Sequence, residues 1–241
     1  MSIGTFVIIL WHSSYSIHGV YPCIHDVDGS LLVAFVPLMI ESSVDNDYEM
    51  WSIADNDHLW VFDKLIVAKK AGHVCGPRGM PVPKPDFYMV RPISNFEGMG
   101  IGARKVWLDF CTLELHPGEF WCEFFTGDHI SVDYHLYKPV LTVKGTPHPN
   151  APHSKFIKWE KLETSIPQPA MLGKIPLFYK TINCEFIGGK LIEIHLRGNP
   201  DFVYGNNIAI PVWEGEEINP PQSMRFVEAE DTNRLGFYID S

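Results

Sequence analysis

The chain has 241 residues, of which 46% are hydrophobic and 20% are charged. This balance is typical of globular proteins and argues against a disordered or fibrous chain. Nineteen Lys and Arg against 29 Asp and Glu leave a formal net charge of −10. A surface of this sign repels phosphate backbones, so we expect no nucleic-acid partner.

Neither the apolar runs nor the cysteines indicate a membrane or an oxidising compartment. Met1–Trp11 lacks the positively charged segment of a signal peptide. Leu31–Ile40 contains a proline and is shorter than the roughly 18 apolar residues that a spanning helix needs. The five cysteines are widely spaced and include no C-x-x-C pair, which favours reducing surroundings. We therefore expect a cytoplasmic protein with no membrane partner.

The first part of the chain combines apolar runs, an acidic stretch and one helical pattern. Strands are expected at Thr5–Trp11 and Ser30–Ile40, and the acidic stretch Glu41–Asp57 follows them. Apolar residues then fall at helical spacing from Leu59 onward, with Asn56 or Asp57 available as N-cap and Gly72 just past the last turn. This pattern predicts a helix over Asp57–Ala71.

The rest of the chain is mostly period-two alternation, which predicts strands. The expected strands are Phe87–Arg91, 105–110, Glu119–Phe125, Ile130–Tyr137, Thr181–Ile187 and Lys190–Leu196. Residues 144–155 are polar and rich in proline, and we expect a loop there. Pro169–Tyr179 is predicted as a helix that Pro176 interrupts.

A glycine-rich segment, Gly98-Met-Gly-Ile-Gly102, is a candidate anion-binding loop. Successive backbone N–H groups can cradle phosphate oxygens, and glycine permits their close approach. A dinucleotide-binding fold would need a helix directly after it, whereas period-two alternation resumes at Val106. The loop is therefore expected to join two strands, and a plain hairpin tip remains the alternative.

Two basic residues are candidates for contact with an anion, and the sequence supports them unequally. Alternation places Arg91 in an apolar row with Met89 and Phe87, so its charge must reach solvent or meet an anion. An arginine extending to solvent from a strand end is an equal alternative. Lys64 lies in the expected helix and, taken alone, is predicted to be a solvated lysine.

Two carboxylates, Glu185 and Glu193, flank the Gly188-Gly189 turn. A two-residue turn would place them on opposite faces, whereas a three-residue loop would place them directly opposite each other, with His195 and Arg197 following on the same face. Like charges placed opposite each other cost stability, so that face implies a cation between them, for which Mg²⁺ is suited. Two solvent-facing glutamates on an edge hairpin are the alternative.

The order in which short sequence motifs follow one another along the chain is a more specific signal of a family than any single motif. The motifs are Asp63-Lys-Leu65, Ala71-Gly72, Pro81-Val-Pro83, Val90-Arg-Pro92, Gly98–Gly102, Cys122-Glu-Phe-Phe-Thr-Gly127, Ile130-Ser-Val-Asp133 and Glu193-Ile-His-Leu-Arg197. In this order they resemble the ATP-grasp superfamily, which includes D-alanine–D-alanine ligase, glutathione synthetase and biotin carboxylase. The resemblance covers about Leu59 to Pro211.

The resemblance implies an α+β fold in which two α+β lobes with antiparallel sheets grip a nucleotide. It implies a first lobe over residues 58–118 and a second lobe with a C-terminal tail over 119–241. Residues 1–57 would be a short, strand-rich N-terminal region that is reduced relative to the family.

By position, the resemblance also implies roles for individual residues. The phosphates of the nucleotide would bind to Lys64, Arg91, Gly98, Gly100 and Gly102, and its adenine and ribose would contact Glu123, Phe125 and His129. A metal ion would be held by Glu185, Glu193 and His195. Arg91 and Arg197 would act in catalysis. Three of these residues depart from the family pattern, since Arg91 replaces a lysine, His129 a glutamate and His195 an asparagine. An imidazole suits Mn²⁺ better than Mg²⁺.

The function implied is that of an ATP-dependent carboxylate–amine ligase that works through an acyl phosphate. It would use ATP, Mg²⁺ or Mn²⁺, and a small carboxylate and amine, with amino acids or peptides among the candidates. An ATP-grasp kinase and a nucleotide-binding module without catalysis are the alternatives. The sequence leaves the acceptor and the oligomeric state open.

Overall fold

The computed structural model describes residues 24–25, 31–32, 46–94, 96, 100–231 and 234–241. The chain divides into two compact units, Met1–Leu38 and Met39–Ser241. In the first unit, β1 (Ile24–His25) and β2 (Leu31–Leu32) form an antiparallel pair. The strand expected at Thr5–Trp11 and most of the one at Ser30–Ile40 lie outside the described residues.

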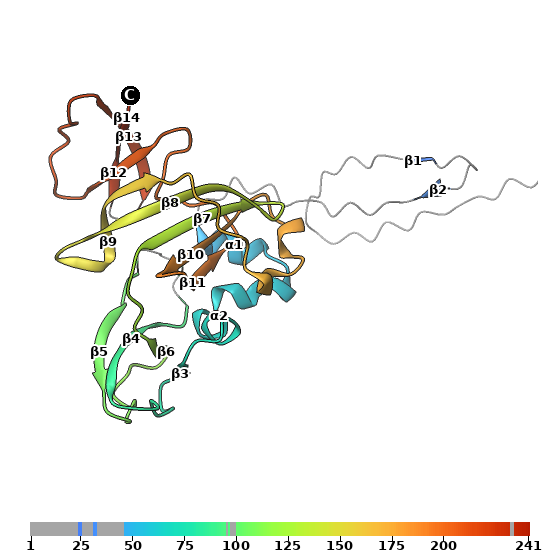
Figure 1. Cartoon of the computed structure of the whole chain (residues 1–241), viewed down its shortest axis with the longest axis vertical. Helices are drawn as coiled ribbons and strands as arrows, with labels where there is room; N and C mark the ends of the chain where they lie inside the picture. The colour runs from blue at the N-terminus through green and yellow to red at the C-terminus, as the bar shows by residue number, and fades with distance from the viewer. Residues whose placement is uncertain (1–23, 26–30, 33–45, 95, 97–99, 232–233) are drawn as a thin grey trace, which may run out of the picture. The chain divides into compact units, whose positions relative to one another are not determined.

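The second unit is built on two antiparallel sheets (Figure 1). The smaller sheet has the order β3-β6-β4-β5 and consists of β3 (Cys75–Pro77), β4 (Asp86–Pro92), β5 (Arg104–Leu108) and β6 (Glu119–Glu123). The larger has the order β11-β10-β7-β8-β9-β12-β14-β13 and consists of β7 (His129–His135), β8 (Lys138–His148), β9 (Ala151–Lys161), β10 (Ile182–Ile187), β11 (Lys190–His195), β12 (Ile208–Trp213), β13 (Met224–Asp231) and β14 (Arg234–Asp240). The helices are few and short, which confirms the expected α+β class. Within the described residues, none of them is long and apolar enough to cross a membrane.

Helical segments cover one face of the larger sheet. They are α1 (Asp47–Ile53), the 3-10 helix η1 (Asn56–Phe62), α2 (Lys64–Lys70), and the 3-10 helices η2 (Ala170–Leu172) and η3 (Ile175–Leu177). Met50, Val61 and Val67 pack against Ile182 and Cys184 of β10. The alternate residues of β7, β10 and β11 point to the opposite face. Polar groups can therefore occupy that face while the core stays apolar.

The helix expected over Asp57–Ala71 is interrupted at Asp63. The backbone of Asp63 is extended, with ψ at 99°, and its carboxylate accepts a hydrogen bond from Ile66 N at 2.8 Å. Asp63 therefore closes η1 and acts as the N-cap of α2, which makes Lys64 the first residue of a new helix. Gly72 lies just past the end of α2 with φ at +77°, as expected.

The described part of residues 1–57 is not rich in strands, because α1 lies within the acidic stretch. Asn46 caps α1 by accepting a hydrogen bond from Glu49 N, and Met50 is fully buried in the core. The alternation between acidic and apolar residues at this point is too short to distinguish a helix from a loop. The sequence assigned no helix or strand to this acidic stretch, and the structure places α1 there.

The glycine-rich segment joins two antiparallel strands, as expected, since β4 pairs with β5 through Val90 and Arg104. Gly98 lies outside the described residues, whereas Gly100 and Gly102 have φ at +59° and +81°. The proposed lobe boundary at residue 118 would separate β6 from β3 and β4, with which it pairs. By strand pairing, the change of sheet comes after Glu123.

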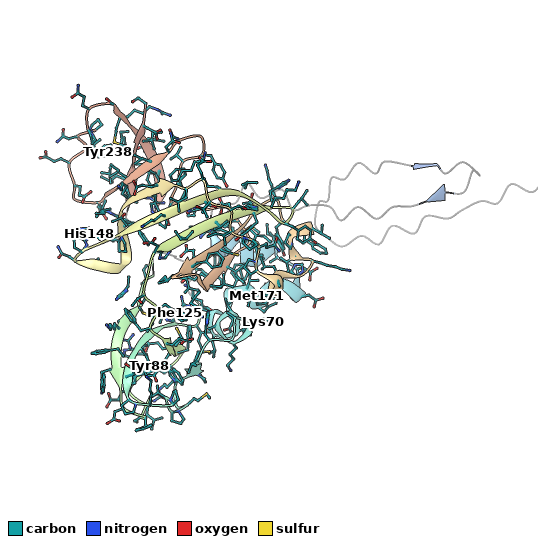
Figure 2. All side chains as sticks on the ribbon, in the orientation of Figure 1. Lys70, Tyr88, Phe125, His148, Met171 and Tyr238 are labelled. Carbon is teal, nitrogen blue, oxygen red and sulfur yellow. The ribbon has the colours of Figure 1, made fainter. Side chains whose placement is uncertain are left out.

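Residues 144–155, which we expected to form a loop, belong to the long β8–β9 hairpin. The ladder runs from Val143–Lys161 to His148–Ala151, with register shifts on both sides of Pro147. Irregular positions of this kind accommodate proline, which cannot donate to a ladder. The helix expected at Pro169–Tyr179 is likewise divided into η2 and η3. Figure 2 shows Tyr88 in the smaller sheet and Tyr238 in the part of the larger sheet that β12–β14 form.

The β10–β11 hairpin has a two-residue turn, Gly188-Gly189, followed by a β-bulge. Ile187 pairs with Lys190 and Phe186 with Leu191, but Glu185 pairs with Glu193. One extra residue in β11 therefore shifts the register by one. The expectation that the turn would be longer than two residues is wrong. The extra residue that places Glu185 opposite Glu193 lies in the bulge and not in the turn.

We expect the two turn glycines to differ sharply in their tolerance of alanine. Both have positive φ, at +55° and +76°, but a Cβ at Gly188 would lie 2.2 Å from the carbonyl oxygen of Thr126, whereas one at Gly189 would meet nothing within 4 Å. Gly189→Ala should lower the free energy of unfolding by about 1 kcal/mol and Gly188→Ala by about 3 kcal/mol. Urea unfolding of both variants tests this, and equal losses would contradict the close packing of the turn against residues 126–128.

Candidate functional site

A cavity of about 850 Å³ lies in the second unit and is lined by residues of both sheets. Ten of the site residues predicted from the sequence line it: Lys64, Arg91, Gly100, Glu123, Phe125, His129, Glu185, Glu193, His195 and Arg197. Gly102 is described but is not among the lining residues, and Gly98 lies outside the described residues. The structure therefore brings together side chains that lie as far apart in sequence as Lys64 and Arg197.

Glu193 is the acidic residue on which the cations of this cavity converge. Its Oε1 accepts hydrogen bonds from Lys64 Nζ at 2.8 Å and from Arg91 Nη1 at 2.9 Å. Arg91 also donates to the carbonyl of Ile192 at 2.8 Å. Burial opposes ionisation of Glu193, but Lys64, His195 and Arg91 outweigh it and hold the pKa of this carboxyl well below its usual value. The prediction that Lys64 and Arg91 point into one cleft is confirmed, and the anion between them is a side chain of the protein.

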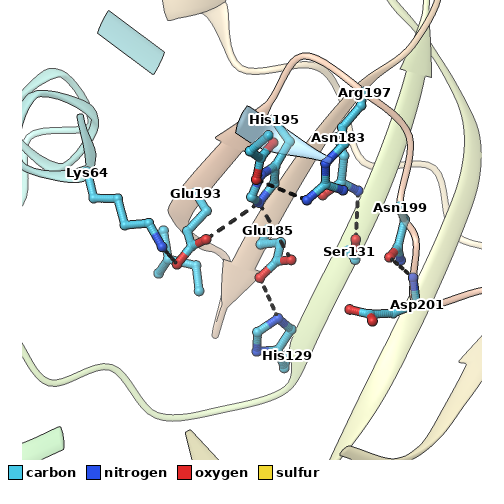
Figure 3. A network of polar contacts seen from close by, with 12 residues as sticks. Lys64, His129, Ser131, Asn183, Glu185, Glu193, His195, Arg197, Asn199 and Asp201 are labelled. Carbon is cyan, nitrogen blue, oxygen red and sulfur yellow. Dashed lines mark hydrogen bonds and ion pairs between the residues drawn. The ribbon is translucent and has the colours of Figure 1, made fainter. Parts of the chain in front are cut away.

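Glu185 lies directly across from Glu193 on the same face of the β10–β11 hairpin, as the site interpretation requires (Figure 3). Its Oε2 is 3.1 Å from Nε2 of His129, which belongs to β7. Burial would raise the pKa of Glu185, but the hydrogen bond and charge of His129 lower it below its usual value. The register of β7 against β10, which pairs Ser131 with Glu185, brings His129 within reach.

His195 lies between the two glutamates. Its Nε2 is 3.4 Å from Oε2 of Glu193 and 3.9 Å from Oε1 of Glu185. Burial would lower its pKa, but the charge of Asp47 and hydrogen bonds to Asp47 and Glu193 raise it to about 9. At neutral pH the ring is then a cation with both nitrogens protonated. The cation that the sequence required between the carboxylates is thus supplied in part by this imidazolium.

Asp47 is a site residue that the sequence analysis missed. Its Oδ2 accepts from His195 Nδ1 at 2.8 Å and from Arg197 Nη2 at 3.0 Å. Burial opposes its charge, but the two cations outweigh it and lower its pKa to about 2. Asp47 therefore fixes the orientation of His195 and holds Arg197 beside it. The acidic stretch was visible in the sequence, but no spacing rule identifies which of its carboxylates turns inward.

Asp133 is a second missed residue, and it holds the chain that follows β11. It accepts hydrogen bonds from Asn183 Nδ2 at 2.8 Å, from the backbone N–H of Asn199 at 3.0 Å, and from the hydroxyl of Tyr204. Burial raises its pKa above the ordinary value. This network fixes residues 199–204, which line the far end of the cavity.

The residues expected near a nucleobase lie at the other end, where the two sheets approach each other. Glu123 accepts a hydrogen bond from Val74 N at 3.2 Å. The ring of Phe125 lies 4.7 Å from that of His73, and His129 lies 4.8 Å from Phe156. Both Phe125 and Phe156 line the cavity, which gives this end flat, partly apolar walls.

The side chains that the sequence predicted as metal ligands, Glu185, Glu193 and His195, suit a hard cation only in part. Among the residues that the structure describes, no three His, Cys, Asp or Glu side chains are grouped as they would be around a bound ion. The oxygens of Glu185 and Glu193 fit the preference of Mg²⁺ for carboxylates. A protonated His195 has no lone pair to offer, so ligation by His195, as the sequence suggested, requires loss of a proton that Asp47 and Glu193 stabilise.

We expect the buried carboxylate of Asp47 to be one of the main local contributors to stability. Asp47→Asn keeps the shape but leaves Arg197 and His195 without their shared anion, so the free energy of unfolding should fall by about 3 kcal/mol. Asp57→Asn, at an exposed position on η1, should change it by less than about 0.5 kcal/mol. Chemical denaturation of the two variants provides the measurement, and matching values would show that the inward carboxylate is dispensable.

No protein-family model matches the chain, and neither does any curated protein sequence. Among solved structures it is similar to an ATP-grasp superfamily protein from Archaeoglobus fulgidus, with 14% identity and a TM-score of 0.45 over 75% of this chain and 64% of that one. It is also similar to the ATP-grasp ligase PsnB (13%, TM-score 0.31, 57% and 51%) and to D-alanine–D-alanine ligase from Bacillus anthracis (14%, 0.31, 57% and 57%). The chain thus spans between half and two thirds of these proteins. In the order of its motifs, the chain resembles the ATP-grasp superfamily.

Proposed function

We propose that this chain is an ATP-dependent carboxylate–amine ligase that works through an acyl phosphate. The observation that carries the proposal is the placement of Glu185 and Glu193 side by side, with Lys64 and Arg91 on Glu193, in one cavity. Two carboxylates and two cations from four different elements are the parts that binding of a metal–triphosphate complex needs. A small carboxylate and an amine, such as an amino acid or a peptide end, would be the other substrates.

Lys64 and Arg91 would bind the phosphates of ATP. Their side chains are each 9% exposed, so water screens their charges poorly. Lys64 offers a point charge, whereas Arg91 offers a planar fork that matches two phosphate oxygens. Since both now donate to Glu193, phosphate binding would be an exchange of one anion for another.

Glu185 and Glu193 would hold Mg²⁺, because carboxylate oxygens are its preferred ligands. A bound Mg²⁺ would neutralise charge that develops on the transferred phosphoryl group. Release of Glu193 from Lys64 and Arg91 would free its oxygens for this role. His129 would keep Glu185 oriented through the 3.1 Å contact between them.

Arg197 would stabilise the charge that develops during transfer. It lies beside His195, since both donate to the same oxygen of Asp47. A cation already fixed by a buried carboxylate costs little reorganisation when charge develops next to it. The substrate carboxylate would attack the γ-phosphorus and release ADP, and an amine would then displace phosphate from the acyl phosphate.

A nucleotide-binding module without catalysis is the second candidate, and one observation favours it. The carboxylates already have protein partners, because Lys64 and Arg91 bind Glu193, and His129 and His195 lie beside Glu185. Such a site has no need of a metal in the ligand-free state. A kinase would share the nucleotide site and differ only in the acceptor. A hydroxylamine trap separates the ligase from the other two, since only the ligase forms an acyl phosphate that hydroxylamine converts to a hydroxamate.

Removal of Arg91 should weaken nucleotide binding while the fold persists. We expect Arg91→Ala to raise the Kd for ATP by about tenfold to a hundredfold, which corresponds to the loss of a charge-assisted pair of hydrogen bonds. Lys190→Ala, at the exposed first residue of β11, is the matched control and should leave the Kd unchanged. Calorimetric titration well below the melting temperature measures both, and unchanged affinity in the Arg91 variant would exclude this nucleotide site.

Glu193→Gln should strengthen the binding of metal-free phosphates and abolish the gain in ATP affinity that Mg²⁺ gives. The variant no longer competes for Lys64 and Arg91, so metal-free tripolyphosphate should bind about tenfold more tightly, a gain of about 1.4 kcal/mol. The increase in ATP affinity that Mg²⁺ gives the unaltered protein should disappear. Glu163→Gln, with a side chain that is 90% exposed, controls for net charge. If Mg²⁺ has no effect on either protein, the non-catalytic module is the better description.

A further inference from the structure

Two cysteines that are far apart in sequence lie opposite each other on adjacent strands of the smaller sheet. Cys75 of β3 and Cys122 of β6 are direct partners in the antiparallel ladder. At the next pair along, Glu123 N donates to the carbonyl of Val74 at 2.9 Å. Because hydrogen-bonded and non-hydrogen-bonded pairs alternate in such a ladder, Cys75 and Cys122 form a non-hydrogen-bonded pair. At these positions the two Cα atoms are closest, at about 4.5 Å.

This geometry is within the range that a disulfide requires. Bridged cysteines have Cα atoms roughly 4.4–6.8 Å apart and side chains that point to the same side, which direct cross-strand partners satisfy. The two side chains contact one apolar cluster, formed with Leu65 and Ala68 of α2 and Phe120 of β6. Both are free thiols. A bond between them would need no change in the course of either strand.

We propose that Cys75 and Cys122 form a reversible disulfide that cross-links β3 to β6 beside the cavity. Cys122 is one of the residues that line the cavity, next to Arg91 and Glu123, so the bond would lie in the wall of the nucleotide site. The proposal stands on strand register and does not depend on the ligase function. The spacing of 47 residues conceals the pair in the sequence, where C-x-x-C was the pattern sought.

The two thiols have different parts in the reaction. Cys75 is partly exposed, whereas Cys122 is only 3% exposed, so a small disulfide such as oxidised glutathione meets Cys75 first. The Cys75 thiolate attacks one sulfur of glutathione disulfide, which forms a mixed disulfide and releases one glutathione thiolate. The Cys122 thiolate then attacks the sulfur of Cys75 and releases the second glutathione. In total, the two protein thiols lose two electrons, and one glutathione disulfide accepts them and becomes two thiols.

Burial sets the rate of this reaction. It raises the pKa of the Cys75 thiol and raises that of Cys122 to about 11, where the nearby Cys75 adds to the effect. Since the thiolate is the nucleophile, formation of the bond should be slow at neutral pH and faster at higher pH. Cys184 is fully buried, with a pKa raised well above the ordinary value, and serves as an unreactive internal reference.

The test uses the full chain with Cys23 and Cys111 replaced by serine, so that the exposed Cys111 cannot react. The folded, reduced protein is incubated with oxidised glutathione at a series of pH values, free thiols are blocked, and the products are identified by intact-mass and peptide mass spectrometry. We expect a product lighter by two hydrogen atoms, with Cys75 joined to Cys122, that dithiothreitol reverses. In concentrated urea the preference for this pair should disappear.

Two further variants make the result decisive. With Cys122→Ser, the mixed disulfide between Cys75 and glutathione should accumulate, since no second thiol resolves it. With Cys75→Ser, Cys122 should remain reduced. If the parent protein retains glutathione on Cys75 just as the Cys122→Ser variant does, or if neither thiol reacts while the protein is folded, the proposed disulfide is wrong.

Discussion

The arrangement of this site depends on one buried oxygen, Oε1 of Glu193, which Lys64 and Arg91 share at 2.8 and 2.9 Å. The three residues come from β11, α2 and β4, so this contact joins the larger sheet to the smaller one. Burial of an ionised carboxylate costs several kcal/mol, and attraction at short range offsets that cost only when the partners are well placed. Lys64 and Arg91 therefore both depend on Glu193, since loss of this carboxylate would leave two poorly exposed cations without their shared anion.

The position of Glu193 in turn depends on a single inserted residue. Side chains alternate along a strand, so a one-residue slip in β11 would turn Glu193 to the apolar face that α2 covers. The bulge between Glu185 and Phe186 fixes the register, and the tight Gly188-Gly189 turn, packed against residues 126–128, limits slippage. The same turn adjoins the start of β7, where His129 contacts Glu185. Backbone geometry at two glycines thus determines the electrostatics of the site.

The sequence predicted the parts of the site that follow from local periodicity. The strands that carry Arg91, Glu185 and Glu193 were expected from their alternation. The convergence with Lys64 was implied only by the resemblance, and the prediction of a solvated lysine is wrong, because Lys64 is buried. Asp47 was not expected, because its role depends on a contact between residues about 150 apart in sequence, which no local pattern encodes. The β8–β9 hairpin was missed because Pro147 lies between two register shifts, which only the paired strand reveals.

The same reasoning explains why two opposed glutamates do not by themselves require a metal. One of the two turn lengths considered from the sequence placed two like charges on one face and therefore implied a cation between them, but it could not show which cation. In the folded chain Lys64, Arg91 and His195 neutralise Glu193, and His195 is itself held by Asp47. Under the proposed function, the phosphates of ATP would compete with Glu193 for Lys64 and Arg91. A Glu193 carboxylate deprived of those partners needs another cation, so binding of the nucleotide and of the metal must favour each other. This reciprocity is a requirement of linkage, and under the proposed function it would arise because one oxygen of Glu193, now the counter-ion of Lys64 and Arg91, would also serve as a metal ligand.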